Sequence, residues 1–311
     1  MTSPGIVATG VRRSFGTVAA VKNVSLEAHA GRVTGLVGPN GSGKTTLLLM
    51  LSSLLAPDAG EIRIDGVDPV AEPQKARALL GWMPDALGAW GSLTARETLV
   101  VTGKLYDLAR PEAEARAVTM LDQVGLTDLA DSPARVLSRG QKQRLGLARA
   151  LMHDPRVLLL DEPASGLDPQ ARIDLRVLLR RFADEGRTIL VSSHILSELE
   201  EVVDDAVFLV AGESVRQESL AAAAATRSRV WRVRLMADDQ AEAAASVARA
   251  LDRETAGVRA DRGDVFVSFA TEAEAVEALR ALIGAGLAIA EFAPATGRLE
   301  QSFLDLGEVA P

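Results

Sequence analysis

A glycine-rich loop near the N-terminus constrains the fold of this chain more than any other feature. Residues 38–45 read GPNGSGKT and fit the pattern G-x-x-x-x-G-K-[ST]. A short apolar segment precedes the loop and the apolar run TTLLLMLSSLL follows it, which predicts a strand, a loop and a helix in that order. Glycines let backbone N–H groups converge on phosphate oxygens, and a helix N-terminus adds partial positive charge. The pattern therefore predicts a phosphate-binding loop.

Two side chains of this loop have distinct expected roles. Lys44 should reach the β- and γ-phosphates of a nucleotide, and Thr45 should ligate Mg²⁺. The candidate nucleotide-binding residues of the loop are Gly38, Pro39, Asn40, Gly41, Ser42, Gly43, Lys44, Thr45 and Thr46.

A second apolar segment ends in two neighbouring acids. Residues 157–160 read VLLL and are followed by Asp161 and Glu162. Carboxylates at the carboxyl end of a strand lie where open α/β sheets bind ligands. We expect Asp161 to hold Mg²⁺ and Glu162 to polarise an attacking water. Alone, such a pair is more often a solvated strand end; beside the phosphate loop it predicts the second half of the site.

Strand and helix patterns alternate over the first two thirds of the chain. Residues 5–15 and 18–30 read as strands, residues 73–153 as mostly helical, and later strands alternate with helices. This order predicts an α/β fold with a mostly parallel sheet. After an alanine run near residue 220, strand and helix patterns follow a βαββαβ order, which is typical of a ferredoxin-like fold. We expect two domains, residues 1–220 and 226–311, with a closing helix at 298–306.

Composition excludes several classes of function. The 311 residues include no Cys and three His, so disulfide scaffolds and thiolate zinc sites are excluded. A net charge of −8 argues against general nucleic-acid binding. No segment approaches the ~18 apolar residues of a membrane span, and the N-terminus lacks the pattern of a signal peptide. We therefore expect a cytoplasmic protein that binds no nucleic acid.

Three further motifs make the pattern specific. Residues 137–141 read LSRGQ between the loop and the acids, residues 165–168 read SGLD after them, and His194 ends the run VSSH. In this order the motifs resemble those of the ATP-binding subunits of ABC transporters, over about residues 6–215. The resemblance implies a P-loop ATPase core with an inserted helical subdomain at about residues 82–150, and it implies ATP and Mg²⁺ as substrate and cofactor.

The resemblance also implies roles for residues outside the loop. Ser138, Gly140 and Gln141 would form the signature that closes on the nucleotide held by the opposite protomer, and Asp168 would couple the two sites.

Two more roles follow from the resemblance. His194 would be the switch histidine at the γ-phosphate, although a lone His at a strand end is usually a surface residue. Phe15 would stack on adenine, although by itself it would be read as a core residue.

Two positions depart from the commonest pattern of the family. Arg139 stands where Gly is frequent in the signature, and Asp85 stands where the family has a Gln that binds Mg²⁺ and senses the γ-phosphate. Aspartate can still supply an oxygen ligand to Mg²⁺. It can equally cap the following turn, so both interpretations of Asp85 stay open.

The favoured hypothesis is the ATP-hydrolysing subunit of an ABC transporter. A single phosphate loop and a single signature imply a head-to-tail homodimer, attached to a separate polytopic membrane subunit at the inner face of the cell membrane. The C-terminal part, residues 226–311, resembles the accessory domain of exporter-type ABC ATPases, which favours export. The alternatives are a soluble ABC ATPase acting on DNA or ribosomes and a nucleotide sensor without turnover. The first lacks the long coiled coil or second ATPase unit that it needs, and the second is disfavoured by the complete set of Asp161, Glu162 and His194.

Overall fold

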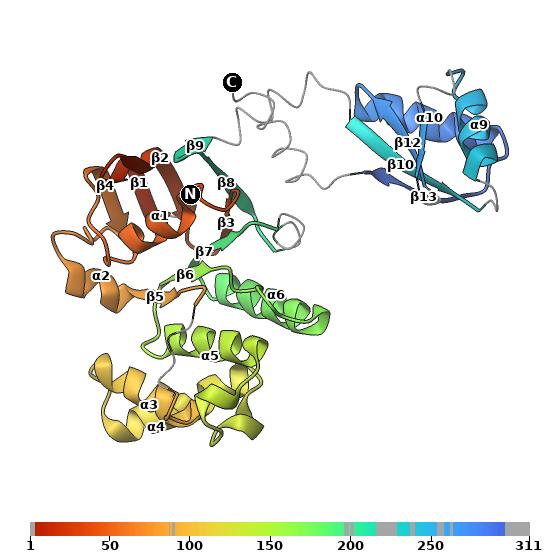
Figure 1. The fold of residues 1–311 in the computed structure, drawn as a ribbon. Coiled ribbons are helices and arrows are strands. Elements are labelled where there is room, and N and C mark those ends of the chain that lie inside the picture. The colour runs from red at the N-terminus through yellow and green to blue at the C-terminus, as the bar shows by residue number, and fades with distance from the viewer. Residues whose placement is uncertain are drawn as a thin grey trace. The chain divides into compact units, whose positions relative to one another are not determined.

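The computed structural model describes residues 4–86, 88, 91–195, 199, 202–215, 229–236, 240–253, 258–261 and 264–295. The chain divides into two compact units, residues 1–217 and 218–311 (Figure 1). The predicted boundary at 220–226 and the predicted closing helix at 298–306 lie outside the described residues, as does most of the helix expected before Leu199.

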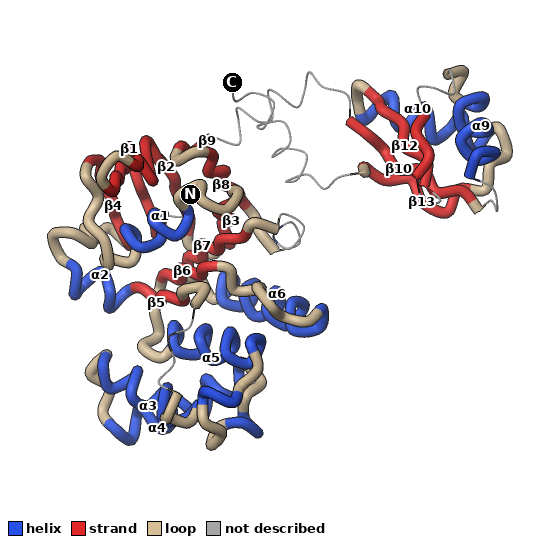
Figure 2. Tube along the Cα trace, viewed as in Figure 1, coloured by secondary structure: helices blue, strands red, loops and turns tan. Residues whose placement is uncertain are grey.

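A nine-stranded sheet forms the centre of the first unit, in the order β4-β1-β2-β9-β8-β3-β7-β6-β5 (Figures 1 and 2). Strands β8, β3, β7, β6 and β5 are mutually parallel, as the alternating pattern predicted, while β4, β1 and β2 form an antiparallel wing. The bounds are β1 Pro4–Phe15, β2 Val18–His29, β3 Val33–Val37, β4 Ala59–Ile64, β5 Leu80–Met83, β6 Val157–Asp161, β7 Thr188–Ser193, β8 Asp205–Val210 and β9 Glu213–Val215.

Strands β3, β6 and β7 are buried at every position. Both faces of a parallel strand are covered, which is why β6 reads as the apolar run VLLL before Asp161, while β3 and β7 also bury small hydroxyl side chains.

The helices of this unit fall into two groups. Near the sheet lie α1 Lys44–Leu51, α2 Pro73–Leu79 and α6 Pro169–Asp184, whereas α3 Ala95–Leu105, α4 Arg110–Gln123 and α5 Arg139–Leu151 form a helical group, in which α5 also contacts β5 (Figure 2). Two short 3₁₀ helices, η1 Thr127–Leu129 and η2 Ala134–Val136, join α4 to α5. Among the described residues, no helix is both long and apolar enough to cross a membrane.

Residues 73–153 were expected to be mostly helical, and the structure corrects this expectation at one segment. Leu80–Met83 form strand β5, which pairs in parallel with β6 at the edge of the sheet. A Cβ on Gly81 would lie 2.3 Å from the carbonyl oxygen of Ala150, so the strand passes close to the end of α5. Four residues are too short for a periodic signal, and the pairing with β6 decides the conformation.

The second unit is a four-stranded antiparallel sheet in the order β11-β12-β10-β13. Its strands are β10 Arg229–Leu235, β11 Val258–Asp261, β12 Asp264–Phe269 and β13 Ile289–Pro294, and its helices are α9 Gln240–Ala250 and α10 Glu272–Gly284. Both helices pack on the sheet around a core that includes Val233, Val247 and Phe269. The order βαββαβ confirms the predicted ferredoxin-like fold.

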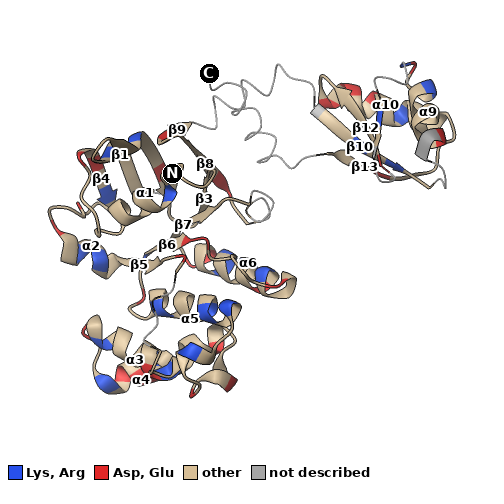
Figure 3. Cartoon of the chain, viewed as in Figure 1, with Lys and Arg blue, Asp and Glu red and all other residues tan. Residues whose placement is uncertain are grey.

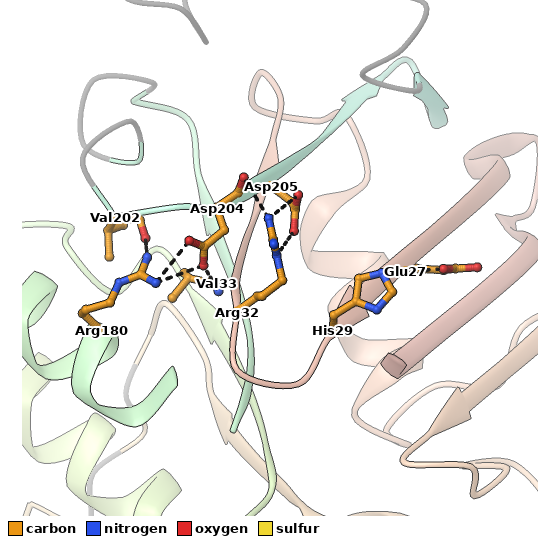
Figure 4. Close-up of polar contacts among 8 residues, drawn as sticks. All are labelled: Glu27, His29, Arg32, Val33, Arg180, Val202, Asp204 and Asp205. Atoms are coloured by element: carbon orange, nitrogen blue, oxygen red, sulfur yellow. Dashed lines mark hydrogen bonds and ion pairs between the residues drawn. The ribbon is translucent and has the colours of Figure 1, made fainter. Parts of the chain in front are cut away.

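An ionic cluster lies where the central strands β3 and β8 begin (Figure 4). The Asp204 carboxylate accepts from the Val33 N–H at 2.8 Å and from the Arg180 guanidinium at 3.1 Å. Arg32 forms a two-pronged pair with Asp205 at 2.6 and 2.9 Å. These bonds join β3, α6 and the start of β8 at the edge opposite the phosphate loop. Elsewhere, acidic and basic residues are interspersed along the described elements of both units (Figure 3).

His153 fixes the start of β5 against the helical group. Its Nε2 donates to the carbonyl oxygen of Leu80 at 3.1 Å, and its ring stacks on Tyr106 with centroids 3.7 Å apart. Burial lowers the pKa of His153 to about 4. The buried surroundings therefore favour the neutral imidazole over the charged imidazolium.

We expect this histidine to make the free energy of unfolding depend on pH. Between the unfolded pKa of 6.5 and the folded value of about 4, the unfolded chain binds more protons. Stability from His153 is therefore complete above 6.5 and decreases by about 3 kcal/mol as the pH falls to 4. In urea unfolding at several pH values, the free energy of unfolding should depend less steeply on pH between 4 and 6.5 for His153→Gln than for wild type. Equal slopes for wild type and His153→Gln would contradict this prediction.

Candidate functional site

The glycine-rich loop joins the end of β3 to the start of α1 (Figure 1). A Cβ on Gly38 would lie 2.3 Å from the carbonyl oxygen of Leu209, and one on Gly43 would lie 2.4 Å from that of Ala20. Gly43 also has a φ of 102°, and it precedes α1 without a side-chain cap. The first N–H groups of α1 are thus left for another acceptor, which is the arrangement of a helix that binds an anion.

Lys44 lies buried within the loop. Its ammonium donates to the carbonyl oxygens of Gly38 at 2.7 Å and Pro39 at 3.2 Å. Burial lowers the pKa of Lys44, and the nearby carboxylates of Glu162 and Asp161 oppose that shift. The ammonium is therefore held by short backbone contacts at the centre of the loop.

Two of the predicted Mg²⁺ ligands meet beside the loop. The Thr45 hydroxyl donates to Asp161 Oδ2 at 3.0 Å, and Asp161 is 2% exposed at the end of β6. A hydroxyl and a carboxylate are the hard oxygen donors that Mg²⁺ prefers, usually together with water and phosphate oxygens. Among the described residues no group of three acidic or His ligands gathers, here or elsewhere, so the remaining ligands would have to be water and phosphate oxygens. The donor set therefore fits Mg²⁺ bound together with a nucleotide.

Glu162 and His194, two of the predicted site residues, lie in direct contact. His194 Nδ1 lies 2.9 Å from Glu162 Oε2. Glu162 has a φ of 50°, a left-handed conformation that is uncommon for a residue with a side chain. Such backbone strain clusters at functional sites.

Ser192 holds both acids in place, and the sequence analysis did not single it out. Its hydroxyl donates to Asp161 Oδ1 at 2.5 Å and accepts from the Glu162 N–H at 3.0 Å. The available signal was a pair of serines, Ser192 and Ser193, which follow the apolar residues of β7 and are buried. The two acids therefore have fixed and different orientations, with Asp161 toward Thr45 and Glu162 toward His194.

The signature residues cap a helix away from this loop. Ser138 Oγ accepts from the Gln141 N–H at 3.2 Å, and Gln141 Oε1 accepts from the Ser138 N–H at 2.9 Å, which makes Ser138 the N-cap of α5. Asp168 caps α6 by accepting from the Ala171 N–H at 2.8 Å. None of the hydrogen bonds of Ser138, Gly140 or Gln141, all within the described part of the chain, reaches the phosphate loop.

Comparison with known proteins identifies the family. The family model described as ABC transporter matches residues 21–165. The chain is 37% identical over 204 residues to the ABC transporter ATP-binding protein NatA of Bacillus subtilis, covering 65% of this chain and 83% of that protein. The chain belongs to the ABC transporter ATP-binding proteins. It is thus the subunit that binds and hydrolyses ATP for such a transporter, which confirms the favoured hypothesis.

Other relatives of this ABC ATPase carry names linked to resistance and export. The linearmycin resistance ATP-binding protein LnrL of Bacillus subtilis is 35% identical over 208 residues, 67% of either chain. A Nod factor export ATP-binding protein I of Burkholderia lata is 39% identical over 207 residues, 67% of this chain and 68% of that one. The dimeric structure of the bacterial ABC transporter cassette MJ0796 matches with a TM-score of 0.64 and 28% identity, over 68% of this chain and 97% of that one.

Phe15 lies at the end of β1, outside the core of the ATPase. Its side chain is 49% exposed, and the Arg13 guanidinium lies 5.0 Å from the ring centroid. The reading of Phe15 as a core residue is therefore wrong, and one face of the ring is covered by a cation.

Asp85 follows β5 and is exposed. Its carbonyl oxygen accepts from Gln143 Nε2 of α5 at 3.3 Å, a contact that the sequence did not predict. Among the described residues no hydrogen bond reaches the Asp85 carboxylate, and residues 87, 89 and 90 lie outside them. Both interpretations of Asp85, as ligand or as cap, stay predictions.

Proposed function

We propose that Lys44, Thr45, Asp161, Glu162 and His194 form one half of an ATP hydrolysis site, which the signature of a second copy completes. The observation that carries the proposal is the 2.9 Å contact between His194 and Glu162, one residue beyond the Asp161 that binds Thr45. Binding groups and a candidate base thus lie on neighbouring strand ends. The other proposed nucleotide contacts are Phe15 for adenine and Gly38, Pro39, Asn40, Gly41, Ser42, Gly43 and Thr46 for the phosphates.

Each half of the site has a separate task in this proposal. Backbone N–H groups of the loop and the Lys44 ammonium bind the phosphates, since charge-assisted hydrogen bonds are strong. Glu162 accepts a hydrogen bond from the attacking water and orients it. Mg²⁺ held at Thr45 and Asp161 would supply charge neutralisation to the phosphate oxygens when bound.

In this proposal His194 positions Glu162 and can also form a hydrogen bond to the product phosphate. With Nδ1 donating to Glu162, the other ring nitrogen donates to a phosphate oxygen only when the ring is protonated. The pair therefore holds the carboxylate in one orientation while one ring nitrogen stays free for the ligand.

The second copy contributes Ser138, Gly140 and Gln141 in a head-to-tail dimer. Ser138 caps the 13-residue helix α5, whose N-terminal end favours an anion. In this arrangement Asp168 lies in the loop that couples the two sites. We propose that residues 1–220 form this ATPase domain and that residues 226–311 form a separate accessory domain.

The membrane partner and the direction of transport belong to the same proposal. We propose a separate polytopic membrane subunit, which places the ATPase in the cytoplasm at the inner face of the membrane. Relatives named for export and for linearmycin resistance favour export. Affinity purification of the full chain from detergent-solubilised membranes should retain a polytopic membrane protein and Mg²⁺-dependent ATPase activity. Recovery of the ATPase alone, without any such protein, would contradict the proposal.

Asp85 gives a separate test of the metal site. We expect Asp85→Asn to raise the Mg²⁺ concentration for half-maximal ATPase activity by about threefold to tenfold, because a charged oxygen near the metal is lost. Asp85→Gln should bring it back toward wild type, and Asp131→Asn in the helical group should leave it unchanged. Superimposable Mg²⁺ titrations of wild type and Asp85→Asn would favour the turn cap, since Asn caps as well as Asp.

A further inference from the structure

We propose that Arg139 is a positioning residue that couples the two ATP sites of the dimer through Ser165. The inference rests on the proposed function, in which Ser138 faces the nucleotide of the partner and Glu162 acts on the nucleotide of its own chain. Arg139 adjoins the first of these residues, and Ser165 lies three residues beyond the second. A link between them therefore joins one site to the other within a single protomer.

The link is a direct hydrogen bond. Arg139 is the first residue of α5, and its Nη2 donates to Ser165 Oγ at 2.7 Å. The side chain crosses Gly166, where an added Cβ would lie 2.5 Å from Arg139 Cδ and where φ is +74°. The loop thus has a glycine at the point where the arginine passes over it.

A second contact packs the same end of α5 against this loop. A Cβ on Gly140 would lie 3.2 Å from Leu167 Cδ2, so the helix and the loop are close at this point as well. Leu167 is 6% exposed. The start of the signature helix is therefore held by one polar and one apolar contact on residues 165–167.

The path from Ser165 to Glu162 is short. The Ser165 N–H donates to the Glu162 carbonyl oxygen at 3.0 Å and closes a four-residue turn. Glu162 itself is held in a left-handed conformation between Ser192 and His194. A displacement of Ser165 by Arg139 must therefore be taken up at the strained backbone of Glu162.

A cavity makes these edge contacts important. About 240 Å³ of space lies between α5 and α6, and residues around it include Gln143, Leu147, Leu167, Asp174 and Leu178. Arg144 also lines it and forms an ion pair with Asp174 at 3.7 Å. The cavity interrupts apolar packing between the two helices. The position of α5 relative to the loop and to α6 therefore depends more on polar contacts such as Arg139–Ser165 and Arg144–Asp174.

Cooperativity of ATP hydrolysis by the purified full-length chain tests this link. Wild type should show a Hill coefficient above 1 for ATP, with a limit of about 2 for two sites. Arg139→Ala and Ser165→Ala should each bring the coefficient toward 1 and lower kcat by about threefold to tenfold, the range expected when one exposed hydrogen bond is lost. The double variant should be no worse than either single variant, because both remove the same contact.

Two further variants separate this role from a general effect of charge. Arg139→Lys keeps a donor for Ser165 and should restore much of the cooperativity. Lys142→Ala removes a cation from the same helix, where its ammonium bonds the Arg135 carbonyl oxygen at 3.3 Å, and should behave as wild type.

Three results would overturn the proposal in different ways. Loss of cooperativity in Arg139→Ala but not in Ser165→Ala would mean that the arginine contacts nucleotide directly. Hydrolysis with the same Hill coefficient in wild type and in both alanine variants would remove the coupling role and leave the proposed function intact. Absence of ATP hydrolysis by wild type would contradict the proposed function and this inference with it.

Discussion

Glu162→Gln is expected to lower ATP turnover by about 10²–10⁴-fold, the usual effect of removing a general base, while ATP remains bound. The amide keeps the size of the side chain and its contact partner His194, which lies 2.9 Å from the carboxylate. It loses the anionic acceptor that orients water. Binding groups such as Lys44 and Thr45 are untouched, so the variant should trap the ATP-bound state.

Two measurements on Glu162→Gln separate binding from turnover. Phosphate release measures kcat, and size-exclusion chromatography with ATP and Mg²⁺ should reveal a dimer that persists in the variant. Glu185→Gln, at the far end of α6, is the matched control and should turn over like wild type. Wild-type kcat in Glu162→Gln would remove Glu162 from the proposed mechanism.

The local pattern of the sequence was sufficient for the main elements of the ATPase. The phosphate loop follows β3 and precedes α1 because an apolar strand, three glycines and an apolar helix are each encoded within a few residues. The end of β6 at Asp161 was equally local, since a fully buried strand is a continuous apolar run. The βαββαβ order of the second unit came from the same alternation.

Pairing between distant segments could not be predicted in the same way. Strand β5 has four residues, and only its partner β6, more than seventy residues later, makes it a strand. Likewise β9 is three residues long and pairs with β8 and β2. Such short segments carry no period of their own, so tertiary contacts decide them.

The candidate site shows the same limit. Motif positions predicted the meeting of Thr45 with Asp161, but the support given by Ser192 and the bond from Arg139 to Ser165 depend on side chains that meet only after folding. Ser138 has two interpretations that are compatible, because it is the N-cap of α5 and also a residue of the signature. The Ser138 hydroxyl accepts from a single N–H, that of Gln141, so other N–H groups of the first turn are left for an anion and the cap does not exclude the proposed role.

Lys44→Ala is expected to weaken ATP binding itself by about 10- to 100-fold, the loss that corresponds to one charge-assisted hydrogen bond. The buried ammonium already lies within the loop, bonded to the carbonyl oxygens of Gly38 and Pro39. No other Lys or Arg belongs to the loop, so its charge is not replaced. Equilibrium dialysis with ATP measures the affinity, and Lys75→Ala on the exposed start of α2 is the control.

The pH dependence of ATP affinity adds a test that a folding defect would not reproduce. Because burial lowers the pKa of Lys44, the ammonium should lose its proton at a lower pH than the ordinary value of 10.5. Wild-type affinity should therefore decline as the pH rises toward that lowered value, while Lys44→Ala should lack this decline. An affinity within about twofold of wild type for Lys44→Ala would mean that the phosphates lie beyond the reach of this side chain. Together with retained binding in Glu162→Gln, loss of binding in Lys44→Ala would separate the residue that holds the phosphates from the residue that orients water.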